Sequence, residues 1–286
     1  MADLFTLWLW PLLALVLLPA ILVYFGLHVV GRGIIFVDLA LAQIAALGIA
    51  TAILFGADPD HGVLPYALAI GFTVAGAALF SLTRFRHPRV PHEAIIGIIY
   101  IVAAAAATLV LSRTAAGDEE IKNLLVGNVL LVSRGEVLRT LGLYAVVGAF
   151  HFALRRKFYL ISFDTDEAER QGMSVRLWDF LFYATFGLVV TSFVRIAGVY
   201  LVFSYLIVPA VCGALLSART ATRLAIGWVV ALTAGVTGLL LSTQWQSMDL
   251  PTGPSIVCAF GALLVVSGIV AYAQSRRAAP VSPTVH

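Results

Sequence analysis

Two polar side chains interrupt an apolar stretch near the N-terminus, "FVDLALAQIAALG" at residues 36–48. Asp38 carries a carboxylate and Gln43 an amide, and both groups offer oxygen atoms that bind cations or accept hydrogen bonds. An ionisable side chain inside a membrane-buried helix is costly, and where one occurs it is by default a candidate for a substrate, ion or proton pathway. The first question is therefore whether this stretch is buried in a membrane.

The composition answers that question. The chain has 286 residues, of which 61% are hydrophobic and only 12% are charged, and its mean hydropathy is +0.99. About a quarter of the residues of a water-soluble domain are charged, so much of this surface must face lipid. The sequence predicts an all-α, polytopic transmembrane helical bundle. The N-terminal apolar run lacks the basic start of a signal peptide and is expected to remain as the first span.

Nine segments are apolar and long enough to cross about 30 Å of hydrocarbon. They lie near residues 6–28, 34–55, 63–83, 92–112, 136–154, 177–194, 197–217, 222–242 and 255–273. The region 177–217 is divided at "RIAG", residues 195–198, and one long interrupted hairpin is the alternative. A further apolar piece, 121–133, is too short to cross and is expected to be a half-helix or a surface helix. The spans form one transmembrane domain over residues 1–275, and residues 276–286 are expected to be a disordered cytoplasmic tail.

The basic residues predict the orientation, because cytoplasmic loops carry an excess of Lys and Arg. With the C-terminus inside, 13 of the 18 basic residues lie on the cytoplasmic side and five outside. The inside set is Arg32, Arg84, Arg86, Arg89, Arg155, Arg156, Lys157, Arg170, Arg176, Arg219, Arg223, Arg276 and Arg277. With nine spans, the N-terminus is then outside.

The longest cytoplasmic loop contains the sequence "FDTDEAERQG". Asp164 is a candidate N-cap with Glu167 three residues later, Arg170 suits the negative end of the helix dipole, and Gly172 suits the position after the helix. These signals predict a two-turn helix over residues 165–171. It is either a docking element for another protein or an amphipathic connection on the membrane surface.

Two further observations bear on function. Pro209 in "SYLIVPAVCG" removes a backbone donor and predicts a kink, which is a candidate gating element. The sequence has no G-x-x-x-x-G-K-[ST], H-E-x-x-H, C-x-x-C or G-x-S-x-G motif. These absences disfavour an enzyme and favour a pathway for something small.

Several segments resemble the motifs of one family. They are "FVDLALAQIAALG", "HEAIIGIIY" at 92–100, "LLVGNVLLVS" at 124–133, "FDTDEAERQG" followed by "GVYLVFSYLIVPAVCGALLS", and "DLPTGPSIV" at 249–257. Their order and spacing, from about residue 28 to residue 272, are similar to those of the membrane permease subunits of ABC-type zinc, manganese and iron importers, the ABC-3 metal permeases. The resemblance implies a type II ABC importer-like fold in a bacterial inner membrane and a divalent metal ion as cargo, without catalysis or a cofactor in this chain.

The resemblance also implies partners. A second permease copy, either identical or closely related, would complete the membrane part. Two cytoplasmic ATPase subunits would bind beneath it, and an extracytoplasmic metal-binding protein would bind above. The helix at 165–171, with Asp164, Glu167, Arg170 and Gly172, would insert into a cleft of the ATPase and couple nucleotide binding to the spans.

The candidate residues of the substrate pathway are Asp38, Gln43, Glu93 and Asn128. Many family members carry an Asp and a His four residues apart in the second span, where this chain has Leu39 and Gln43. Asp38 and Gln43 are about 140° apart around a helix, so they do not share a face, and the metal ligands stay unknown. Gln43 either lines a pathway or bonds a neighbouring helix, and Asp38 either lines a pathway or pairs with Arg32.

Two other transport functions compete with the metal-ion permease. A self-contained secondary transporter would work without an ATPase and usually shows repeated halves, and no convincing repeat occurs in this sequence. An ABC permease for a metal chelate, such as a siderophore or cobalamin, would share the mechanism but typically has a longer chain.

Overall fold

The structure is a computed structural model that describes residues 2–57, 63–84, 90–114, 126–127, 129, 132–244 and 250–278. These residues form helices joined by caps, turns and short connections, and no strand occurs among them. The predicted all-α bundle is therefore confirmed.

The described helices follow the predicted apolar segments closely. They are α1 (Ala2–Arg32), α2 (Val37–Leu54), α3 (Val63–Thr83), α4 (His92–Leu111), α6 (Arg134–Ala153), α7 (Arg155–Phe163), α8 (Thr165–Arg170), α9 (Val175–Leu216), α10 (Thr220–Gln244) and α11 (Thr252–Ala278). In the described part of the chain, seven of them are long and apolar enough to cross a membrane. The pair α6 and α7, bent by 76° between its members, makes eight if it is counted as one broken span.

The difference from nine lies in α9, a 42-residue element that covers two of the predicted spans. Its halves are separated by a single residue, Gly198, whose φ of 76° and ψ of 166° are non-helical. Such angles are open essentially to glycine alone. The break falls within the "RIAG" segment, where the sequence analysis divides the region, and it separates two helical halves within the one element α9.

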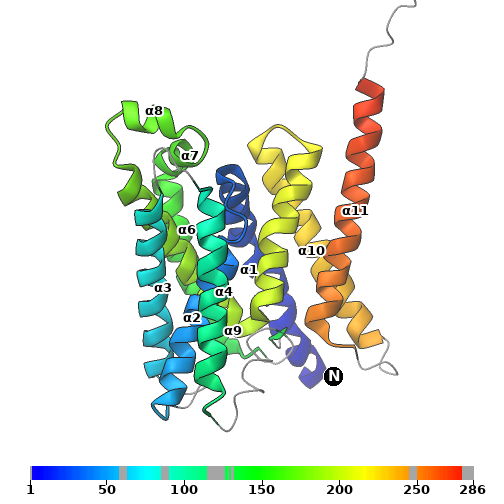
Figure 1. Ribbon diagram of the computed structural model, residues 1–286. Coiled ribbons are helices and arrows are strands. Elements are labelled where there is room, and N and C mark those ends of the chain that lie inside the picture. The colour runs from blue at the N-terminus through cyan, green and yellow to red at the C-terminus, as the bar shows by residue number, and fades with distance from the viewer. Residues whose placement is uncertain are drawn as a thin grey trace, which may run out of the picture.

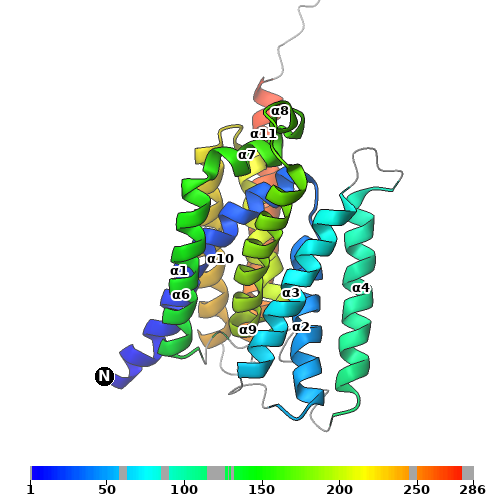
Figure 2. The same cartoon turned by 90° about the vertical axis from the view of Figure 1, so that its left-hand side faces the viewer.

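The ends of the bundle are distinct. In Figures 1 and 2 the N-terminus lies at the lower end, whereas α7, α8 and the end of α11 lie at the upper end. Helix α9 starts next to α8 and finishes where α10 begins, both at the upper end, so it descends and turns back (Figure 1). Residues far apart in the chain, in α1, α7, α8 and α9, thereby meet at one end.

The core is built around α9, which contacts α1, α2, α3, α10 and α11. Its first half contributes the buried rings of Phe182, Tyr183, Phe186 and Phe193. Phe25 of α1 packs against two of them, with ring centroids 5.6 Å from Phe182 and 5.1 Å from Phe186. Aromatic pairs at these distances add to the stabilisation from burial.

Helices α4 and α11 show the opposite pattern and leave large apolar side chains uncovered. Leu109 of α4 is 70% exposed, and Val265 and Ile269 of α11 are each 63% exposed. In water such faces would cause aggregation. They are surfaces for lipid or for another membrane helix.

Three smaller expectations meet the structure here. The backbone of α9 is non-helical at Gly198 and stays helical at Pro209, so its marked break lies before the proline. Helix α11 continues to Ala278, into the segment expected as a tail, and 279–286 lie outside the described residues. Most of the short apolar piece 121–133 also lies outside them.

Candidate functional site

Asp38 lies in the first turn of α2 and is fully buried. Among the described residues, neither of its carboxylate oxygens has a well-formed hydrogen bond, although the backbone N–H groups of Leu39 and of Asp38 itself act on it. A buried polar group without a partner is costly. The burial of the Asp38 carboxyl group is therefore not explained by the stability of the fold.

Glu93 is the acidic neighbour of Asp38. It lies in the first turn of α4, and its Oε1 accepts a hydrogen bond of 3.0 Å from the backbone N–H of Phe36, just before α2. Its Oε2 is buried and has no hydrogen-bond partner in the described part of the chain, and the charge of Glu93 acts on Asp38. Two carboxylates thus meet where α2 and α4 begin, and their oxygens suit a hard divalent cation.

The other predicted pathway residues are placed less completely. Gln43 is buried within α2, with 8% of its surface exposed. Asn128 lies outside the described residues. Its neighbour Gly127, at φ 62°, packs its backbone against Ala197 and Gly198 at the break of α9, where a Cβ would have no room.

No group of three or more His, Cys, Asp or Glu side chains is arranged to hold a metal ion in the part of the chain that the structure describes. Structural metal sites use four ligands and catalytic zinc sites at least three. The Asp38 and Glu93 pair is therefore an incomplete site within these residues of one chain. Its oxygens would hold a passing ion more weakly than such a site.

The predicted capped helix is confirmed as α8. The Asp164 side chain accepts from the backbone N–H of Glu167 at 3.1 Å, the bond of an N-cap. At the other end, Gly172 N–H donates to Glu169 O and Met173 N–H donates to Ala168 O, with Gly172 at φ 76°. These two bonds form a Schellman motif, which satisfies the last carbonyls of the helix.

The side chain of Glu167 has a second job in α8. It accepts from Nε of Arg170 at 2.7 Å and from Nε2 of Gln171 at 2.8 Å, both in the last turn. Hydrogen bonds from Gln171 and Arg170 lower the pKa of this carboxyl from its ordinary value. All four residues predicted for coupling are thus used to shape one short, exposed helix, while their role toward an ATPase stays a prediction.

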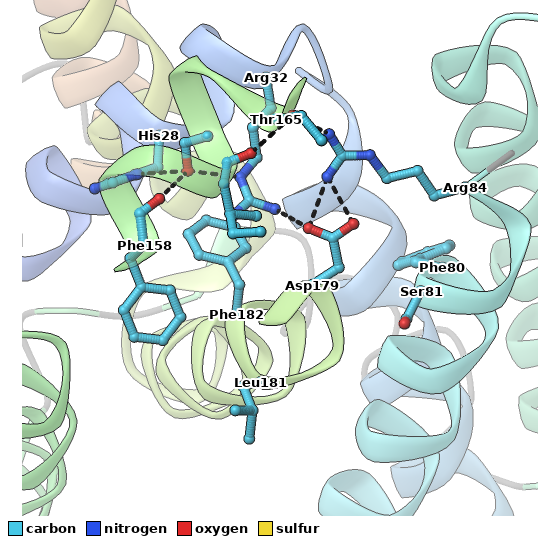
Figure 3. A network of polar contacts seen from close by, with 12 residues as sticks. His28, Arg32, Phe80, Ser81, Arg84, Phe158, Thr165, Asp179, Leu181 and Phe182 are labelled. Carbon is cyan, nitrogen blue, oxygen red and sulfur yellow. Dashed lines mark hydrogen bonds and ion pairs between the residues drawn. The ribbon is translucent and has the colours of Figure 1, made fainter. Parts of the chain in front are cut away.

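One expectation is wrong in its partner. Arg32 does not pair with Asp38, because its Nη1 binds the Oδ1 of Asp179 in α9 at 2.7 Å (Figure 3). Arg84, just after α3, binds the same carboxylate at 2.6 Å. Asp179 is fully buried and is a charged residue that the sequence analysis missed.

A signal for Asp179 is present in the sequence. It is the single acidic residue of the predicted span 177–194. The argument that singles out Asp38, an ionisable side chain in an apolar segment, applies to it equally.

Comparisons with known proteins decide the family. The model of the ABC 3 transport family matches residues 5–271. The chain belongs to this family. With seven candidate membrane helices among its described residues, this ABC 3 family member is a multi-pass bacterial membrane protein.

Similar proteins match almost the whole chain. The manganese transport system membrane protein MntC of Halalkalibacterium halodurans is 25% identical over 285 residues, covering 96% of this chain and 93% of the relative. The chelated iron transport system membrane protein YfeD of Yersinia pestis is 26% identical over 247 residues, covering 82% of each chain.

Two solved structures share the fold. PsaBC from Streptococcus pneumoniae in complex with Fab matches with a TM-score of 0.75 and 21% identity, covering 91% of this chain and 90% of that one. A metal-chelate type ABC transporter in an inward-facing conformation matches with a TM-score of 0.70 and 20% identity, covering 92% and 85%. The ABC 3 family fold therefore extends over nearly all of this chain.

Proposed function

We propose that this chain is the membrane-spanning permease subunit of an ABC importer that passes a divalent transition-metal ion into the cytoplasm. The observation that carries the proposal is the match of the ABC 3 transport family to residues 5–271. Proteins similar to this chain are named for manganese and chelated iron transport. A separate ATPase subunit hydrolyses ATP, and this chain provides the pathway.

The cargo is manganese or iron in preference to zinc. The polar groups of the proposed pathway, Asp38, Gln43, Glu93 and Asn128, offer oxygen and amide atoms, without a histidine or a thiolate. Carboxylate and carbonyl oxygens suit manganese, whereas imidazole and thiolate favour zinc. The cluster of Asp38 with Glu93 supports this placement of the pathway.

The chain crosses the membrane nine times, with the N-terminus outside and the C-terminus inside. The break at Gly198 allows α9 to cross twice, and α6 with α7 adds a crossing to the remaining six helices. The N-terminus lies at the opposite end of the bundle from α8 and the end of α11 (Figures 1 and 2). The predominance of basic residues at the α8 end supports a cytoplasmic position.

The partners are two cytoplasmic ATPase subunits, an extracytoplasmic metal-binding protein and a second permease copy. Helix α8, capped at both ends and partly exposed, is the element that docks into the ATPase, through the shape that Asp164, Glu167, Arg170 and Gly172 maintain. A bend at Pro209 contributes to gating in the second half of α9.

Mild extraction of the chain from its native membrane tests the proposal. An ATPase should co-purify in equal amount, and the complex in proteoliposomes should take up free manganese or iron ions with ATP. Uptake of metal only when a chelator accompanies it would favour the chelate permease. The similarity to YfeD, which is named for chelated iron transport, supports that alternative. Transport by the chain alone, without an ATPase, would favour a secondary transporter instead.

A further inference from the structure

Asp179 is the centre of a buried ion cluster at the α8 end of the bundle (Figure 3). Its Oδ1 accepts hydrogen bonds from Nη1 of Arg32 and Nη1 of Arg84, each at 2.7 Å, and its Oδ2 lies 2.6 Å from Nη1 of Arg84. Arg32 ends α1, and Arg84 follows the end of α3. One carboxylate of α9 thus ties together the ends of two other helices.

The same two arginines also hold the segment that carries α8. Nε of Arg32 donates to Oγ of Ser162 in α7 at 2.9 Å, and Nη2 of Arg84 donates to Oγ1 of Thr165, the first residue of α8, at 3.1 Å. Each arginine therefore binds Asp179 through one nitrogen and donates a hydrogen bond to the α7–α8 segment through another. We call Asp179, Arg32, Arg84, Ser162 and Thr165 the Asp179 cluster.

Further contacts hold the Arg32 side of the cluster in place. The Ser162 hydroxyl donates to the carbonyl of Phe158 at 2.8 Å, so it accepts from Arg32 and from Nδ1–H of His28, also 2.8 Å away. The Arg32 guanidinium stacks over the Phe182 ring, 3.9 Å from its centroid. Two hydrogen bonds and the ring contact thus orient the Arg32 guanidinium.

The electrostatics make the cluster hard to pull apart. The side chains of Asp179 and Arg32 are 0% and 2% exposed, and that of Arg84 is 26% exposed. Separating a buried ion from its partner leaves an uncompensated charge, which is strongly destabilising. Glu169 of α8 adds another negative charge that acts on Arg84. The ion pairs thus hold both arginines on Asp179, and α8 is attached to Arg84 through the Thr165 hydroxyl and the charge of Glu169.

We propose that the Asp179 cluster is a rigid connection that makes α8 move together with α1, α3 and the first half of α9. It transmits a displacement of α8 to the membrane helices and does not itself touch the cargo. The inference rests on the proposed function, in which α8 docks into the ATPase.

The sharpest variant is Thr165→Val, which keeps the shape of the side chain and removes only its hydroxyl. Thr165→Ser keeps the hydroxyl and is the matched rescue. Thr108→Val in α4 is the control, because the Thr108 hydroxyl donates to the carbonyl of Ala104 in its own helix and to no other helix among the described residues. Arg84→Gln removes the guanidinium that connects the end of α3 to Asp179 and Thr165. Each variant is purified as the native complex and placed in proteoliposomes, and ATP hydrolysis and metal uptake are measured together.

The expected result is uncoupling. Thr165→Val and Arg84→Gln should retain the ATPase and its hydrolysis, while ions transported per ATP fall by about fivefold or more, as for the loss of an ordinary coupling free energy. Thr165→Ser and Thr108→Val should keep the wild-type ratio. If Arg84→Gln fails to assemble, Thr165→Val decides.

If Thr165→Val transports as many ions per ATP as the wild type, the proposed rigid connection is wrong. The proposed function stays intact in that case, provided the wild-type complex transports metal. An equal fall in hydrolysis and uptake, with the ratio unchanged, likewise overturns it, because a purely structural role gives that result. If the wild-type chain purifies without any ATPase, the proposed function itself is wrong, so the two failures are distinguishable.

Discussion

At the scale of single residues, the two fully buried carboxylates Asp38 and Asp179 have opposite surroundings. Asp179 accepts from two guanidinium groups, whereas Asp38 has no well-formed hydrogen bond with any residue that the structure describes and is acted on by the negative charge of Glu93. Removing one partner of a buried ion pair is strongly destabilising, and a buried polar group without a partner opposes folding. Selection for function is the simplest reason to keep an unmatched carboxylate at Asp38.

The variant Asp38→Asn separates stability from function. It keeps the shape of the side chain and replaces a fully buried carboxyl group by a neutral amide, so the thermal midpoint of the purified complex should stay within a few degrees of the wild-type value. Uptake of manganese should fall by about tenfold, as expected for the loss of a charged ligand. Differential scanning fluorimetry and proteoliposome uptake measure the two quantities.

Asp179→Asn is the matched control for that variant. It leaves two buried guanidinium groups facing a neutral amide and should lower the stability of the fold by about 3–5 kcal/mol. A clear drop in the midpoint with Asp38→Asn, of the size seen with Asp179→Asn, would show that Asp38 is a structural residue.

At the scale of elements, α8 and the break in α9 depend on glycines with positive φ. Gly172 closes α8 at φ 76°, and Gly198 divides α9 at φ 76°. The ψ of 166° at Gly198 places it in a region that is essentially restricted to glycine. Gly127 packs its backbone against this break, which adds a close approach to the conformational demand.

Gly198→Ala should therefore destabilise the protein by about 1–3 kcal/mol, the cost of a strained backbone conformation. Thermal unfolding of the purified protein should show the loss. Gly261→Ala is the control, because Gly261 lies within α11 with nothing within 4 Å of an added Cβ. An unchanged midpoint for Gly198→Ala would contradict the assignment of the break.

Helix α8 should respond to acid through Glu167. The pKa of this carboxyl is lowered by bonds from Gln171 and Arg170, so its ionised form stabilises the last turn. This contribution is fully present above the ordinary pKa of 4.5 and is lost as the pH falls through the lower folded value. Amide protection factors of α8 should then be constant from about pH 8 to pH 6.

The variant Glu167→Gln removes that contribution at every pH. At neutral pH its α8 amides should exchange faster than those of the wild type, as measured by hydrogen exchange with mass spectrometry. Equal protection in the two proteins would show that Asp164 and the Schellman motif hold α8 without Glu167.

At the scale of the whole molecule, the bundle has two different ends and leaves large apolar side chains uncovered on its sides. The α8 end carries the Asp179 cluster and the paired carboxylates, so the proposed docking element and one part of the proposed pathway lie at the same end. The faces of α4 and α11 leave apolar side chains for lipid or for a second copy of the chain.

Reporter fusions test the proposed orientation of the molecule. Green fluorescent protein fused after His286 should fluoresce, because it folds in the cytoplasm, whereas alkaline phosphatase at the same place should be inactive. Alkaline phosphatase inserted at residues 58–62, between α2 and α3, should be active. The reverse pattern would invert the bundle and place α8 outside, which would end its proposed role toward an ATPase.

The sequence by itself determined the features that depend on local chemistry. Hydropathy marks the apolar segments because each needs only its own 20 or so residues to suit lipid, and the cap of α8 is legible because Asp164, Glu167 and Gly172 lie within one short stretch. Tertiary structure alone decided which charges meet. Arg32 binds Asp179, 147 residues away, and not the nearby Asp38, because helix packing and not chain distance chooses the partner of a buried charge.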